Sequence, residues 1–265
     1  MPILLIFFIW LCVISCAPFA LALCRSKPPR QVGYEMGLAD FFMAAGLVVA
    51  AIFFGSFFGG IAGKIFRFDG ENGMFAGSSI MHVSAIFFMA FFLLHSDAKP
   101  DFFLKIGVLK RLKIFCKGAG FLLGFFLCFL AVSVIWSAIL ALFGFDAQPQ
   151  AVVEYFGKTS GWARVFAFVS IAVFAPVAEE LVFRGVMYGA LKNKIGAVAA
   201  AVVASAVFAL IHFSAFAFLP IFLLSIVLIA LYERYGDLTA PIAAHCAFNS
   251  IMSVLILFRA DLLNG

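Results

Sequence analysis

The sequence predicts an all-α polytopic membrane protein, with about eight transmembrane helices in one bundle. Hydrophobic residues make up 66% of the 265-residue chain and charged residues only 12%, whereas soluble domains average about 45–50% apolar and ~25% charged residues. The apolar residues also gather in runs of about 20, the length that crosses a ~30 Å hydrocarbon core as an α-helix. These observations predict a lipid bilayer as the environment of the chain, and they exclude a soluble globular domain.

The expected spans are separated by turn or charge signals. We expect the first to remain uncleaved, because no positive segment precedes it and its apolar run is long enough to span. A basic stretch with two prolines closes this span, and residues 67–73 form a polar turn. In chain order, we expect the spans at residues 3–23, 41–63, 77–95, 118–143, 162–190, 196–214, 217–232 and 239–258.

The net charge of +5 lies in the loops, so it indicates membrane orientation and contact with anionic lipid, not a nucleic-acid partner. Residues 99–117 carry six of the Lys and Arg side chains. They form either a basic amphipathic helix in the membrane interface or a solvated positive loop. For eight crossings, the distribution of Lys and Arg favours both termini outside. The six cysteines show no spacing typical of a disulfide framework or a metal site.

One apolar stretch, FAPVAEELVFRGVMY at residues 174–188, contains three charged side chains. Each such group costs about 2.5–3.5 kcal/mol at the centre of a membrane helix, so three together indicate a function. Glu180 and Arg184 are four residues apart and share a helix face, which predicts an ion pair. Glu179 points about 100° away from Glu180, so we expect it to face a cavity. Pro176 is expected to kink the helix beside these groups.

Two further polar groups follow in later apolar stretches. His212 ends the sequence FALIH, and His245 and Asn249 stack on one helix face at four-residue spacing. Carboxylate, imidazole and amide groups together suit a site that activates water. Each group also has a structural interpretation, because an ion pair, a membrane histidine or an asparagine can join helices by hydrogen bonds. Their occurrence in neighbouring spans favours a hydrolytic site.

The three motifs, EExxxR, FxxxH and HxxxN in this order, resemble the CPBP (Abi) family of intramembrane proteases. That family includes type II CAAX prenyl endopeptidases and bacteriocin-processing or self-immunity proteins. The approach Gly236–Ile242, read GDLTAPI, is also similar to the segment before the family's second histidine. The resemblance covers residues 161–258, and the first four spans match no family. We expect an N-terminal part, 1–117, of transmembrane helices with a basic loop, followed by a catalytic helical bundle, 118–265, that is similar to this family.

The resemblance implies a role for each motif residue. Glu179 would be the general base that activates water, and His212 and His245 would hold that water or a metal ion. Asn249 would stabilise the oxyanion, while Glu180 and Arg184 would shape the site. Two histidines and a glutamate can bind Zn²⁺, but the sequence has no HExxH motif that would make zinc the default, so zinc remains open. Serine-elbow and aspartyl alternatives are disfavoured, because GxSxG and GxGD are absent.

The expected function is that of an intramembrane endopeptidase, a metalloprotease by family, acting on a hydrophobic or lipidated peptide at a bacterial inner membrane. One alternative is a non-enzymatic bacteriocin-immunity or regulatory protein that binds a peptide. A second is a proton-coupled transporter, because intramembrane Glu and His also form proton relays. A transporter would distribute its ionisable groups along a pathway, and here they cluster.

The depths of the predicted site residues give a topology expectation. Glu179 and His212 lie about 25 Å from the 193–196 turn, whereas His245 lies only about 10 Å from the turn at 235–239. For His212 and His245 to lie at the same depth, one of two arrangements is required. Either the hairpin 184–205 projects past the membrane, which we favour, or residues 214–220 are re-entrant.

Overall fold

All secondary structure in the described part of the chain is helical. The computed structural model describes residues 38–65, 70–95, 106–145, 151–159 and 161–264, and these ranges contain no strand. Six helical stretches in them are long and apolar enough to cross a membrane, which confirms a multi-pass membrane architecture. They are Phe42–Ala62, Phe75–Phe92, Val108–Leu142, Ala163–Ile195, Ala215–Tyr235 and Thr239–Arg259.

Six of the eight expected spans correspond to these stretches, so the count of about eight is approximate. The span expected at 3–23 lies outside the described residues. The span expected at 196–214 is shorter than predicted, because α9 (Ala197–Leu210) has 14 residues, about 21 Å against a ~30 Å core. The helix ends where residues 211–212 turn and Phe213 takes a φ of 48°, a left-handed value that is uncommon for a residue other than glycine.

Two other expectations about connections are wrong in part. Helix α3 (Gly70–His95) already includes the end of the polar turn expected at 67–73, while residues 67–69 are not described. Residues 108–117 are neither a separate interface helix nor a loop, because they are the first turns of the 35-residue helix α4 (Val108–Leu142). Apolar residues stand between the basic ones there, and the helix of the apolar span begins within this basic stretch.

The chain divides into two compact units, which we describe separately. The first contains α4, most of α9, α10 (Ala215–Tyr235) and α11 (Thr239–Asn264) up to Phe248. The second contains α2 (Leu38–Ile65), α3, the helices from α5 (Ala151–Lys158) to α8 (Gly189–Ile195), and the rest of α11. The boundary expected between residues 117 and 118 remains a prediction.

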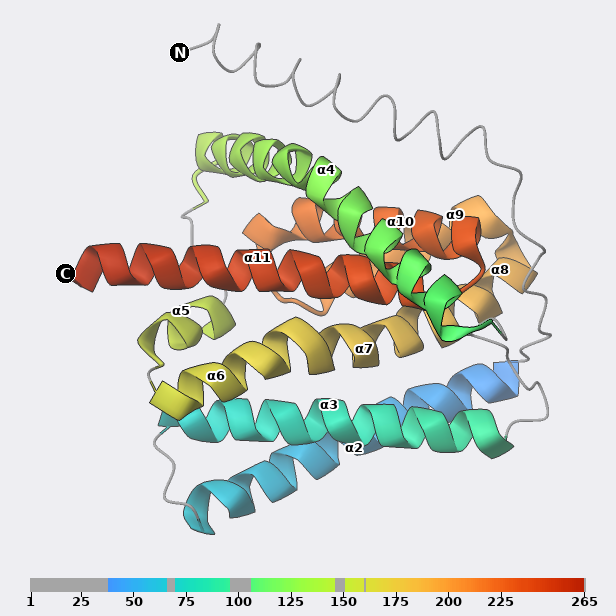
Figure 1. The fold of residues 1–265 in the computed structure, drawn as a ribbon, viewed down its shortest axis with the longest axis horizontal. Coiled ribbons are helices and arrows are strands. Elements are labelled where there is room, and N and C mark those ends of the chain that lie inside the picture. Colours follow the sequence, from blue (N-terminus) through green and yellow to red (C-terminus); the bar gives the residue numbers. More distant parts are fainter. Residues whose placement is uncertain (1–37, 66–69, 96–105, 146–150, 160, 265) are drawn as a thin grey trace, which may run out of the picture. The chain divides into compact units, whose positions relative to one another are not determined.

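In the first unit, α4 crosses α10 (Figure 1). Their apolar side chains form a core that includes Leu122, Phe129, Leu224 and Leu228. Gly118 of α4 lies directly against the start of α11, where a Cβ atom would overlap the backbone of Ala240. The absent side chain therefore permits close contact between the two helices, as small residues commonly do in membrane bundles.

We expect Gly118→Ala to destabilise the protein by about 1–3 kcal/mol, because the added methyl group overpacks against rigid backbone. Gly120→Ala is a matched control on the same helix, since nothing lies within 4 Å of its Cβ position. The control should be neutral or stabilising by up to about 1 kcal/mol, as alanine favours helix over glycine. Unfolding of both variants in detergent tests this, and equal effects would contradict the packing argument.

In the second unit, α2 and α3 approach closely through glycines. Gly59 of α2 faces Gly77 of α3, and Gly55 faces the backbone of Met81. On its other side, α3 lies along α6 (Gly161–Val169) and α7 (Ala175–Glu180) (Figure 1). A buried hydrogen bond of 2.8 Å between Ser79 Oγ and Ser170 Oγ joins α3 to the segment that connects α6 with α7. The helix that carries the two glutamates is thus packed directly on α3.

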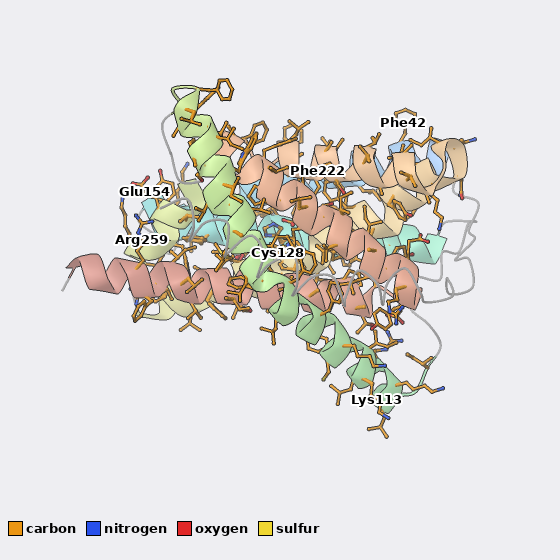
Figure 2. The ribbon with its side chains drawn as sticks, turned by 90° about the horizontal axis from the view of Figure 1, so that it is seen from above. Phe42, Lys113, Cys128, Glu154, Phe222 and Arg259 are labelled. Carbon is orange, nitrogen blue, oxygen red and sulfur yellow. The ribbon has the colours of Figure 1, made fainter. Side chains whose placement is uncertain are left out.

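Large apolar side chains face outward on both units. Phe42 is 67% exposed on α2 of the second unit, and Leu123 is 59% exposed on α4 of the first. Figure 2 labels Phe42. Lys113 lies near the basic end of α4 (Figure 2). Acyl chains would solvate such apolar surfaces, which agrees with the predicted contact with a bilayer.

Candidate active site

Glu180 and Arg184 form the predicted ion pair. An Arg184 guanidinium N–H donates to Glu180 Oε1 at 3.0 Å, and both side chains are completely buried. Glu180 ends α7 and Arg184 lies in the following π-helix η2 (Leu181–Tyr188). Two charges at this depth are tolerated because each compensates the other, and removal of one partner would leave an isolated buried charge. The pair is confirmed as a buried structural feature of the second unit.

Glu179 has a different environment from its neighbour. Its side chain is half-buried, whereas that of Glu180 is fully buried. The charge of Glu179 acts on Arg184 and also on His82 of α3. Successive residues of a helix are rotated by about 100°, which is enough to give the two carboxylates different environments. Glu179 is thus the more accessible of the two glutamates, while the cavity that it is expected to face and its role as the base remain predictions.

The helix before Glu179 changes its backbone hydrogen-bonding pattern near Pro176. Residues Ser170–Phe174 form the π-helix η1, in which the backbone N–H of Ala175 bonds to Ser170 O, five residues back. In this register the next donor would be residue 176, but proline has no N–H, so the carbonyl of Ile171 lacks its backbone partner. Asn249 supplies the missing donor through an Nδ2–H bond of 2.9 Å to Ile171 O. Such π-segments are frequent at functional sites.

This bond bears on the role expected of Asn249. The asparagine amide has two N–H donors, and one is directed to Ile171 O, which joins α11 to the helix that carries Glu179. The second donor is the one that an oxyanion could use. The joining contact agrees with the structural interpretation of Asn249, while its oxyanion role remains a prediction.

In the first unit, His212 lies just after the end of α9. Its Nδ1 atom is 2.7 Å from the carbonyl oxygen of Phe208, one turn earlier. Because a carbonyl only accepts hydrogen bonds, Nδ1 must carry the proton, and a neutral ring then has its lone pair on Nε2. Metal-binding and water-binding histidines are commonly oriented by such a bond at the other nitrogen.

Phe208 also links the two histidines. Its ring packs edge-on against His212, with centroids 5.0 Å apart, and against His245 of α11, with centroids 5.9 Å apart. Both imidazoles therefore contact the same ring in the first unit, and their convergence on one water molecule or metal ion remains a prediction. The FxxxH spacing indicated the contact with His212, but no sequence signal indicated that the same ring reaches His245.

A buried carboxylate fixes the start of the helix that carries His245. Asp237 accepts the backbone N–H of Thr239 at 2.8 Å. Arg111 of α4 lies 3.4 Å from Asp237 and donates to Thr239 Oγ1 at 2.9 Å. Gly236, with a φ of 60°, ends α10 immediately before this turn. The lead-in motif thus positions α11, and its partner Arg111 was not anticipated from the sequence.

The six predicted site residues are divided between the units. Glu179, Glu180, Arg184 and Asn249 belong to the second unit, and His212 and His245 to the first. Among the described residues, no three His, Cys, Asp or Glu side chains form a group that could hold a metal ion. A catalytic zinc requires about three protein ligands, and the metal-ligand roles of His212 and His245 remain predictions.

Comparison with known proteins identifies the segment that carries these residues. Residues 161–251 match the family described as type II CAAX prenyl endopeptidase Rce1-like, and this range contains all six predicted site residues. The chain is also 38% identical over 93 residues to UPF0177 protein YaiH of Lactococcus lactis subsp. lactis (strain IL1403). That alignment covers 34% of this chain and 38% of the relative. No solved structure matches the chain. Residues 161–251 therefore match the Rce1-like family, as their three motifs predicted.

Proposed function

We propose that this protein is an intramembrane endopeptidase of the CAAX protease type, which hydrolyses a peptide bond of a membrane-associated or lipid-modified peptide. The family match supports the protease class. The observation that carries the proposal is the contrast between the two adjacent glutamates. Glu180 is enclosed with Arg184, while the half-buried Glu179 is the carboxylate more able to reach water. A structural ion pair alone would not require the second glutamate.

In the proposed reaction, Glu179 takes a proton from a water molecule as that water attacks the carbonyl carbon of the scissile bond. The proton then passes to the amine that leaves when the C–N bond breaks, which restores the carboxylate. In this proposal His212 and His245 would hold the water, which is the role that the family resemblance implies for them. The second N–H of Asn249 can donate to the oxygen that becomes negative in the tetrahedral intermediate.

The proposed substrate is a peptide with a hydrophobic or lipidated segment. A site formed by membrane helices favours a peptide that partitions into the bilayer, because the lipid group concentrates it there. The prenylated C-terminal tetrapeptide motif is the family's substrate class, and we extend it to this chain as part of the proposal. A bacterial inner membrane is the proposed location.

Cleavage of two matched peptides tests this function. The full chain, reconstituted in lipid nanodiscs, is incubated with a CAAX peptide that carries a farnesylated cysteine and with the same peptide without the lipid. We expect cleavage after the cysteine in the farnesylated peptide and at least about tenfold less in the other, because only the lipidated form is anchored. Binding of both peptides without any cleavage would contradict the proposal and favour the immunity or regulatory alternative.

The same preparation tests the proposed zinc. If His212 and His245 hold a metal, the purified protein should contain about one equivalent of zinc, and His212→Ala should lose it. Chelator-sensitive cleavage that Zn²⁺ restores would establish this role. Full cleavage by chelator-treated, metal-free protein would instead assign the two histidines to the water molecule alone.

A further inference from the structure

His82 of α3 is a polar side chain to which neither the motifs nor the family match assigns a role. It lies in the middle of the apolar stretch Phe75–Phe92. Its Nδ1 atom is buried and has no hydrogen-bond partner among the described residues. A buried polar atom without a partner is unfavourable and rare, so its presence in a native protein calls for an explanation.

The packing of α3 places His82 close to the glutamates. Ala85 of α3 and Ala178 of α7 belong to one small cluster with Ala51. Ala178 directly precedes Glu179, and His82 lies one turn before Ala85 on the same face of α3. The two alanines bring the helices together with little side-chain volume between them. The imidazole of His82 thus lies beside the segment that presents Glu179.

The interaction between the charge of Glu179 and the ring of His82 agrees with this placement. The carboxylate of Glu179 is the charge that acts on the His82 ring. All these residues belong to the second unit, so the relation depends only on contacts within it. The hydrogen bond between Ser79 and Ser170 also joins α3 to η1, so these helices have a polar contact that does not involve His82.

We propose that His82 is a positioning residue for Glu179, and that its ring holds the carboxylate through one water molecule. A general base is commonly oriented by a third group in this way. The inference rests on the proposed function for its consequence in catalysis, but the contact itself can be measured without activity. It adds α3, which lies outside residues 161–251, to the site.

The contact is tested by nuclear magnetic resonance of the full chain labelled at histidine. The chain has only four histidines, so the signal lost in His82→Gln identifies the ring. We expect Glu179→Gln to shift the ring nitrogen resonances of His82, because it removes the charge that the ring faces. Ring resonances that are unmoved by Glu179→Gln would overturn the proposal, whatever the activity of the protein.

The consequence is tested by cleavage of the farnesylated peptide. His82→Gln should lower kcat by about 10- to 100-fold, as is typical when the orienting partner of an active-site group is removed, with KM within about twofold and an altered pH profile. Ser79→Ala is the matched control on the same face of α3. It should lower thermal stability and leave the pH profile unchanged, since it removes only a structural hydrogen bond.

These outcomes separate the two proposals. If the wild-type protein cleaves neither peptide, the proposed function fails, and the resonance shift still decides whether His82 holds Glu179. If the wild type cleaves and His82→Gln keeps both kcat and the pH profile of the wild type, the positioning role is overturned while the function stands.

Discussion

Replacement of Glu179 by glutamine is expected to reduce cleavage of the farnesylated peptide by at least about 10²- to 10⁴-fold, the usual contribution of a general base. Glutamine has nearly the same shape but takes no proton from water. Because the side chain is only half-buried, the thermal midpoint should stay close to that of the wild type. The measurement is kcat and KM in nanodiscs beside thermal unfolding of the same preparations.

Glu180→Gln is the matched control for this variant, because it makes the same chemical change one residue later. It should lower stability strongly, since Arg184 would lose the carboxylate that compensates its buried charge. Full cleavage by Glu179→Gln would show that the base has been assigned to the wrong residue. Complete inactivity of both variants at unchanged stability would also contradict the division of roles.

The second large effect is expected from Arg184→Met, which should destabilise the protein by about 3–5 kcal/mol, because it leaves the Glu180 carboxylate buried without a counter-charge. Arg184 and Glu180 are both fully buried in a pair of 3.0 Å. Unfolding by a denaturing detergent measures the loss.

An exposed pair with the same spacing provides the control for Arg184→Met. Lys158 and Glu154 are also four residues apart, 2.8 Å from each other, but both are more than half exposed. Lys158→Met should change stability by less than about 0.5 kcal/mol. A comparable loss in both variants would show that burial is not the cause.

The double variant Glu180→Leu with Arg184→Met distinguishes a structural pair from a catalytic one. Well-packed apolar side chains can replace a buried ion pair with little loss of stability, so we expect most of the stability to return. If cleavage returns as well, the pair serves only the fold. Restored stability without cleavage would indicate that the pair also determines where Glu179 lies.

Much of the fold class followed from the sequence, because the length and hydrophobicity of a membrane span are local properties. The predicted spans were wrong where hydrophobicity or charge alone did not indicate the backbone conformation. The apolar run at 196–214 was long enough to cross, but α9 stops at Leu210, because hydrophobicity does not record the backbone turn around Phe213. Residues 108–117 were assigned to a connection by their charge, yet helical periodicity continued through them into α4.

The candidate site divides in the same way. The sequence by itself determined the Glu180–Arg184 pair and the different orientation of Glu179, since one helix fixes the geometry of residues four apart. Only the tertiary structure set the charge of Glu179 near His82, packed Phe208 against both His212 and His245, and joined Arg111 to Asp237. These partners come from different helices, and which faces meet depends on the close fit of small residues such as Gly118, Ala85 and Ala178. Spacing along a single chain does not encode that fit.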